Sequence, residues 1–214
     1  MANKKILILA MPRTGTTVIQ TILSKAFATD NLSEPLNRFI VKTNPTKIYP
    51  SNADPYTWIT NQPHGIIKLL SIVLDHFDFD KLMAAANFDH VVLVERDNLV
   101  DGCLSLKHAE ITNKYHRFAG EDIAPEKFTV TPFDLELWHR SYKLYNEAKD
   151  FVINSKISYT IVSYDNFIAG VPQYVEGHRL ESNASYGTVP NNLNYQTLCT
   201  NWQEVETYIR NKTC

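Results

Sequence analysis

The chain alternates short apolar runs with segments of helical periodicity, and this alternation restricts its fold more than any other feature. Runs at 5–10, 64–70 and 90–95 are rich in Ile, Leu and Val, and a further candidate strand spans 159–164. Short runs of this kind are typical of strands that are buried on both faces. Helical spacing is found at 15–27, 79–87, 97–116, 131–155 and 201–211. The expected fold class is therefore α/β, a three-layer α/β/α sandwich with a central, mainly parallel sheet.

Capping residues predict where several helices begin. Ser33 can cap a short helix that follows it, Asp97 or Asn98 the helix after the third strand, and Thr131 the long helix. Residues 41–63 are rich in Asn, Pro and Thr and predict a long loop, the kind of segment that often forms a lid or a binding wall.

Composition excludes several classes of protein. The 214 residues are 44% hydrophobic and 21% charged, which fits one soluble domain over 1–214. A formal charge of −2 gives no general attraction to nucleic acid or to an anionic membrane. Three cysteines without CxxC spacing predict neither a disulfide framework nor a zinc site. No apolar stretch approaches the ~20 residues of a membrane span, so we expect a cytoplasmic protein.

The stretch "LILAMPRTGTTVIQ" predicts an anion site where the first strand leads into the first helix. Backbone N–H groups at a helix N-terminus attract anions, Gly15 allows close approach, and the hydroxyls of Thr14, Thr16 and Thr17 add donors. The stretch departs from the phosphate loop G-x-x-x-x-G-K-[ST], because Ala10 replaces the first glycine and Thr16 the lysine. Arg13 supplies a cation ahead of the glycine instead. The pattern alone leaves open an ordinary polar turn.

A second candidate site follows the strand at 90–95, in "VVLVERDNLVDGCLSL". Arg96 ends the strand and Ser105 lies in the following helix. Taken alone, Arg96 could equally be a surface ion-pair partner and Ser105 an ordinary helix residue.

Together the two stretches resemble the nucleotide-binding elements of sulfotransferases, which use 3′-phosphoadenosine 5′-phosphosulfate (PAPS) as donor and have a P-loop-like fold. "PRTGTT" is similar to their 5′-phosphosulfate loop. The resemblance implies that Arg13 contacts the phosphosulfate bridge, while Thr14, Gly15, Thr16 and Thr17 surround the 5′-phosphate. It implies that Arg96 and Ser105 bind the 3′-phosphate. Their interval of nine residues resembles that of the bacterial trehalose sulfotransferase type.

Further site residues are implied by the same resemblance. "SEPLNRF" is similar to the E-P-L segment of carbohydrate sulfotransferases, which makes Glu34 the candidate general base; Glu34 could instead be a first-turn acid of the short helix. Lys68 is a catalytic candidate that reaches the donor sulfate or the acceptor, or else a strand-edge lysine that extends to water. His64 is a rival base, although it precedes its strand. Tyr164 would lie near the adenine or the second loop, or be a buried aromatic.

Two later segments are less specific. His108, Tyr115, His116 and Arg117 could line an acceptor pocket, or form a polar helix end. The basic segment that closes over the 3′-phosphate in many sulfotransferases is not recovered, because 176–195 contains Arg179 as its one arginine and no lysine.

The expected activity is transfer of a sulfuryl group from PAPS to the hydroxyl of a small-molecule or saccharide acceptor, a carbohydrate or glycolipid in particular. The product of the donor is 3′-phosphoadenosine 5′-phosphate (PAP), and no metal is required. One alternative is a P-loop nucleotide kinase or nucleoside triphosphatase, with Glu95 as the acid of its second motif. Another is a non-catalytic module that binds an adenosine bisphosphate.

Overall fold

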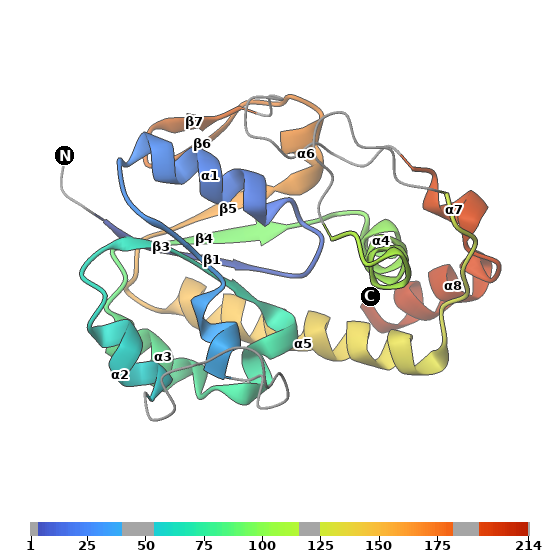
Figure 1. Cartoon of the computed structure of the whole chain (residues 1–214), viewed down its shortest axis with the longest axis horizontal. Coiled ribbons are helices and arrows are strands. Elements are labelled where there is room, and N and C mark those ends of the chain that lie inside the picture. Colours follow the sequence, from blue (N-terminus) through green and yellow to red (C-terminus); the bar gives the residue numbers. More distant parts are fainter. Residues whose placement is uncertain (1–3, 40–53, 116–124, 182–192, 214) are drawn as a thin grey trace.

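A five-stranded parallel sheet forms the centre of the molecule (Figure 1). The computed structural model describes residues 4–39, 54–115, 125–181 and 193–213. The strands lie in the order β2-β3-β1-β4-β5, so that the first strand is central. They span β1 Lys5–Ala10, β2 Asn31–Ser33, β3 Gly65–Leu70, β4 His90–Glu95 and β5 Tyr159–Ser163. The strands predicted from the apolar runs are confirmed, and β2 was not predicted.

The sheet is buried on both faces because its central strands are apolar at most consecutive positions. In β1, Ile6 and Ile8 pack on one side and Leu7 and Leu9 on the other, and all four are fully buried. The two sides belong to separate hydrophobic clusters, as a three-layer arrangement requires.

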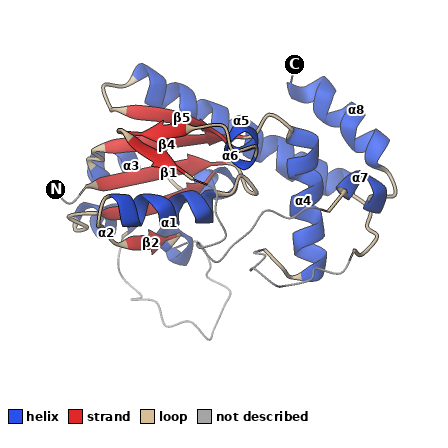
Figure 2. Cartoon of the chain, turned by 90° about the horizontal axis from the view of Figure 1, so that it is seen from above, coloured by secondary structure: helices blue, strands red, loops and turns tan. Residues whose placement is uncertain are grey.

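Helices cover both faces and extend past one end of the sheet (Figures 1 and 2). α1 (Thr16–Ala26), α6 (Tyr164–Ile168) and a two-stranded hairpin cover the first face, and α3 (Phe79–Ala86) and α5 (Pro132–Asn154) cover the second. α4 (Leu99–Thr112), α7 (Tyr195–Leu198) and α8 (Trp202–Thr213) lie beyond the carboxyl ends of the strands. The remaining elements are α2 Pro55–Thr60, the hairpin strands β6 Gln173–Val175 and β7 His178–Leu180, and the 3-10 helices η1 Pro35–Phe39 and η2 Ser71–His76. In the described parts of the chain, no helix combines the length and the apolar character that a membrane span needs.

A buried lysine joins two helices to the amino end of the sheet. Lys5 is 5% exposed, and its Nζ donates hydrogen bonds to the carbonyls of Ile59 (2.6 Å) and Ala86 (2.7 Å). These carbonyls belong to the last turns of α2 and α3, where the negative end of the helix dipole favours a cation.

The helix starts test the capping predictions. Thr131 caps α5 in a capping box with Asp134, and the Asn98 side chain caps α4 by accepting from the backbone N–H of Asp101. The prediction for Ser33 is wrong, because it ends β2 with a left-handed backbone (φ 58°) and a 3-10 helix follows.

The predicted loop over 41–63 is also partly wrong. Asp54 caps α2, whose first residue is Pro55, and this Asp-Pro start was hidden by the loop-like composition of its surroundings. The residues of that segment before 54 lie outside the described residues.

The order of the strands creates a crevice between two carboxyl ends. The connection from β1 leads to β2 on one side, whereas the connection from β4 leads to β5 on the other. Neighbouring strands whose connections diverge in this way leave a crevice outside their carboxyl ends, where ligands of such folds gather. The loops 11–15 and 96–98 both border this crevice.

Candidate functional site

The loop after β1 is curled by two left-handed residues. Arg13 and Gly15 both have φ 66°, and Thr14 between them donates its hydroxyl proton to the carbonyl of Met11 (2.9 Å). Gly15 is the N-cap of α1 and has no side chain to cap the first N–H groups. Those groups therefore remain available to an anion at the positive end of the helix.

Tyr164 covers this loop closely enough to require glycine beneath it. A Cβ on Gly15 would lie 2.6 Å from Cε2 of Tyr164 and 2.8 Å from Cδ2. Burial raises the pKa of the Tyr164 phenol, which keeps it neutral.

The second loop meets the first through the guanidinium of Arg96. Its Nη1 donates to the carbonyl of Arg13 (2.9 Å), Nη2 is ion-paired with Asp101, and Cζ lies 5.0 Å from the ring centroid of Tyr164. The Arg96 side chain is 9% exposed, and its buried Nε has no hydrogen-bond partner among the described residues. Burial raises the pKa of Asp101 against the opposing effect of Arg96. Asp165 supports the loop by accepting from the N–H groups of residues 97 (2.6 Å) and 98 (3.3 Å).

Ser105 connects α4 to the first loop. Its hydroxyl accepts a hydrogen bond from Arg13 Nε (3.0 Å) and donates to the Tyr195 hydroxyl (3.3 Å). Arg13 also donates from Nη1 to the carbonyl of Tyr115. Arg13, Arg96, Ser105 and Tyr164, which come from three separate stretches of the sequence, thus form one cluster in the crevice between β1 and β4.

A buried chain of polar groups extends from α1 to Glu34. Lys68 is 4% exposed, and its Nζ donates to the Thr17 hydroxyl (3.1 Å) and forms an ion pair with Glu34 Oε1 (2.8 Å). The other carboxylate oxygen of Glu34 accepts from Asn37 Nδ2. The strand-edge interpretation of Lys68 is wrong, because β3 lies between β2 and β1. Glu34 lies between β2 and η1, so it is not a first-turn acid of an α-helix either.

The other candidates lie apart from this cluster or are engaged elsewhere. His64 lies at the amino end of β3, where its Nε2 is 3.5 Å from Asp30 Oδ2. His108 is buried, with its ring against those of Phe128 (5.7 Å) and Tyr195 (5.6 Å). Arg179 is in β7, 3.4 Å from Glu181.

Two of the predicted acceptor-pocket residues fall outside the ranges that the structure describes. His116 and Arg117 lie outside the described residues, as does the whole segment 182–192. Within the part of the chain that is described, no three His, Cys, Asp or Glu side chains are grouped so that they could hold a metal ion.

Several residues of the cluster escaped the sequence analysis. Asp101 had a local signal, because it lies five residues after Arg96 in the first turn of α4. Asn37 also lies close in sequence, three residues after its partner Glu34. Asp165 and Tyr195 had no local signal, since they reach the site only through packing of distant elements.

Comparisons of the sequence with protein-family models and with curated proteins find no match. The chemistry of the site is therefore inferred from its own residues.

Proposed function

We propose that the chain is a PAPS-dependent sulfotransferase. The observation that carries this proposal is the meeting of Arg13, Arg96 and Ser105 in the crevice between β1 and β4. The resemblance assigns these residues to the two phosphate groups of a single donor, and such a donor requires both loops at one place.

The residues of the crevice fit a ligand with two anionic ends. The N-terminus of α1 and Arg13 suit the 5′-phosphosulfate, while Arg96 and Ser105 suit the 3′-phosphate. The buried Nε of Arg96 has no partner among the described residues, and it can donate a hydrogen bond to a phosphate oxygen. Binding of both ends requires the hydrogen bond between Arg13 Nε and Ser105 to open. The ring of Tyr164 offers a flat apolar surface beside both loops.

The chain from Thr17 to Glu34 suits the transfer step. The acceptor oxygen forms a bond to sulfur as the bond from sulfur to the bridging phosphate oxygen breaks, and that oxygen keeps the electron pair. The acceptor proton passes to the carboxylate of Glu34. Arg13 and Lys68 stabilise the negative charge that develops on the leaving oxygen, since both are cations at the end of the crevice where α1 begins.

The kinase alternative receives less support from the geometry. Glu95 would have to serve a metal-bound triphosphate, but its Oε1 is ion-paired with Lys149 Nζ (3.0 Å). The loop also has Thr16 where that class has its lysine.

Donor binding is tested by thermal unfolding with PAP, PAPS or ATP, each with and without Mg²⁺. A ligand at a hundred times its dissociation constant stabilises the native state by about 2.7 kcal/mol, which for this length raises the midpoint by roughly 5–10 °C. We expect PAP to give this shift without Mg²⁺, and Arg13→Ala and Arg96→Ala to abolish it. Arg210→Ala, at an exposed arginine of α8, is the matched control that keeps the shift. Stabilisation by ATP with Mg²⁺ alone would overturn the proposal.

Turnover is tested with labelled PAPS and a panel of alcohols and saccharides. Glu34→Gln is expected to lower kcat by roughly 10²–10⁴ while PAP binding is retained. Glu147→Gln, at an exposed position of α5, is the control. Full activity of Glu34→Gln would remove Glu34 as base and leave donor binding intact. Donor binding with no turnover on any acceptor would favour the non-catalytic module.

A further inference from the structure

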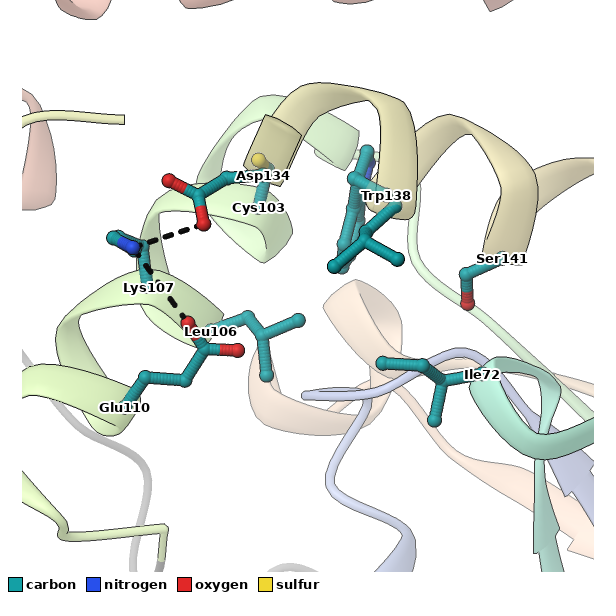
Figure 3. A pocket seen from close by; sticks show the side chains of 9 residues that line it. Ile72, Cys103, Leu106, Lys107, Glu110, Asp134, Trp138 and Ser141 are labelled. Atoms are coloured by element: carbon teal, nitrogen blue, oxygen red, sulfur yellow. Dashed lines mark hydrogen bonds and ion pairs between the residues drawn. The ribbon is translucent and has the colours of Figure 1, made fainter. Parts of the chain in front are cut away.

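A cleft lies between α4, α5 and η2, apart from the cluster of loops described above (Figure 3). Its walls are apolar and its two ends are polar, with room for roughly two water-sized groups. The lining residues are Ile72, Cys103, Leu106, Lys107, Glu110, Asp134, Leu137, Trp138 and Ser141.

Two residues that line the cleft are close in sequence to residues of the candidate site. Ile72 follows the end of β3, the strand that carries Lys68, so the two are separated by on the order of 10 Å of chain. Leu106 is the neighbour of Ser105 on α4, although a step of one residue turns its side chain to a different face of the helix. The cleft therefore lies at the end of the sheet where the strands have their carboxyl ends, which is also the end that carries the loops.

Exposed apolar side chains gather at this cleft. Ile72 and Leu137 line the cleft and are each 37% exposed, and Phe133, which lies one turn before Leu137 on α5 and is not a lining residue, is 66% exposed. Single exposed apolar residues are ordinary, but several around one concave site indicate a surface that binds an apolar group.

The charged end of the cleft is acidic overall. Lys107 Nζ contacts Asp134 Oδ1 (2.9 Å) and Glu110 Oε2 (3.9 Å), so that two carboxylates face one ammonium group (Figure 3). Burial raises the pKa of Glu110 by more than the nearby ammonium group of Lys107 lowers it. An anionic ligand is repelled here, whereas a hydroxyl or a cationic group can donate a hydrogen bond.

We propose that this cleft binds an apolar substituent of the acceptor. The acceptor is then an uncharged or cationic alcohol that carries a short alkyl group, of which about two methylenes fit the cleft. Alkyl glycosides are acceptors of this kind. That the ligand is an acceptor rests on the proposed sulfotransferase activity. That it carries an apolar group rests on the cleft itself.

Binding is tested with hexyl and methyl β-D-glucoside, which have the same head group, in the absence of donor. Each buried methylene strengthens binding about fourfold, so two in the cleft give at least a tenfold lower dissociation constant for the hexyl compound by calorimetry. The indole N–H signal of Trp138, assigned from its loss in Trp138→Phe, is expected to shift with the hexyl compound. Hexanoate, which is anionic, is expected to bind more weakly than 1-hexanol.

Matched variants on one helix locate the site. Leu137→Gln is expected to reduce the tenfold gain to less than threefold. Ile153→Gln is the control, because Ile153 is also on α5, is also 37% exposed and is not among the residues of the cleft. Equal dissociation constants for the two glucosides, or an equal gain in both variants, would overturn the inference.

The two proposals fail in distinguishable ways. If PAP stabilises the protein but the hexyl group gives no gain, the cleft is not an acceptor site and the proposed function stands. If the gain depends on Leu137 but neither PAP nor PAPS binds, the cleft binds apolar groups in a protein of another function, and its role in an acceptor site is overturned. A KM for hexyl glucoside that is at least tenfold lower than for methyl glucoside, and that Leu137→Gln raises, supports both.

Discussion

The contact of Tyr164 with Gly15 gives the sharpest test of the site's architecture. Gly15→Ala places a Cβ 2.6 Å from the Tyr164 ring, a distance that requires the ring or the loop to move. It also puts a side chain on a residue with φ 66°. We expect the variant to fold with reduced stability and to lose PAP binding, because the moving loop carries the N–H groups of the proposed phosphate site.

The two costs have different sizes and different sources. A left-handed alanine costs about 1–2 kcal/mol, whatever surrounds it. Overpacking against the ring costs about a further 1–3 kcal/mol. Gly15→Ala is thus expected to lower the free energy of unfolding by about 2–5 kcal/mol.

A double-mutant cycle separates these costs. In a Tyr164→Ala background the ring is gone, and Gly15→Ala should cost only the backbone part, about 1–2 kcal/mol. Urea unfolding followed by circular dichroism of the four proteins gives the coupling energy. A cost of Gly15→Ala that is the same in both backgrounds, within about 0.5 kcal/mol, would refute the close packing of Tyr164 on the loop.

Two predictions concern the amino end of the sheet. Lys5→Met removes the ammonium donor from the carbonyls of Ile59 and Ala86, of which Ile59 keeps a backbone N–H, so urea unfolding should show a loss of about 1–3 kcal/mol, whereas Lys143→Met on the exposed side of α5 should change little. Burial lowers the pKa of His90 from 6.5, more than Glu176 raises it, and Lys4 acts in the same direction as burial. Because the unfolded chain then binds the proton more tightly, stability should fall as the pH drops below 6.5, and His90→Asn should flatten this slope. An unchanged slope in that variant would contradict the assignment.

The fold was largely predictable because its signals are local. Strands β1, β3 and β4 are continuous apolar runs, and the starts of α4 and α5 carry their own capping residues. The elements that were missed are short: β2 and the β6–β7 hairpin have three residues per strand. Segments of that length contain too few side chains for a period to be recognised, and they form because a neighbouring element pairs with them.

The candidate site was predictable in its parts. Arg13 and Gly15 lie in one strand-to-helix turn, and the anion site there follows from the helix N-terminus alone. Arg96 could be named as a second cation, but its partners could not. Asp101 lies close in sequence, whereas the Arg13 carbonyl reaches Arg96 only because β1 and β4 are neighbours in the sheet.

The sequence by itself determined which segments are buried strands, where the candidate anion-binding turn lies, and that its cation precedes the glycine. These properties depend on residues within a few positions of one another. Only the tertiary structure decided that Arg13 meets Ser105, that Tyr164 covers Gly15, and that Lys68 points to Thr17 and Glu34 rather than to water. Each of these contacts depends on the order of the strands in the sheet. That order is selected by burial of apolar faces over the whole chain, so no local sequence pattern predicts it.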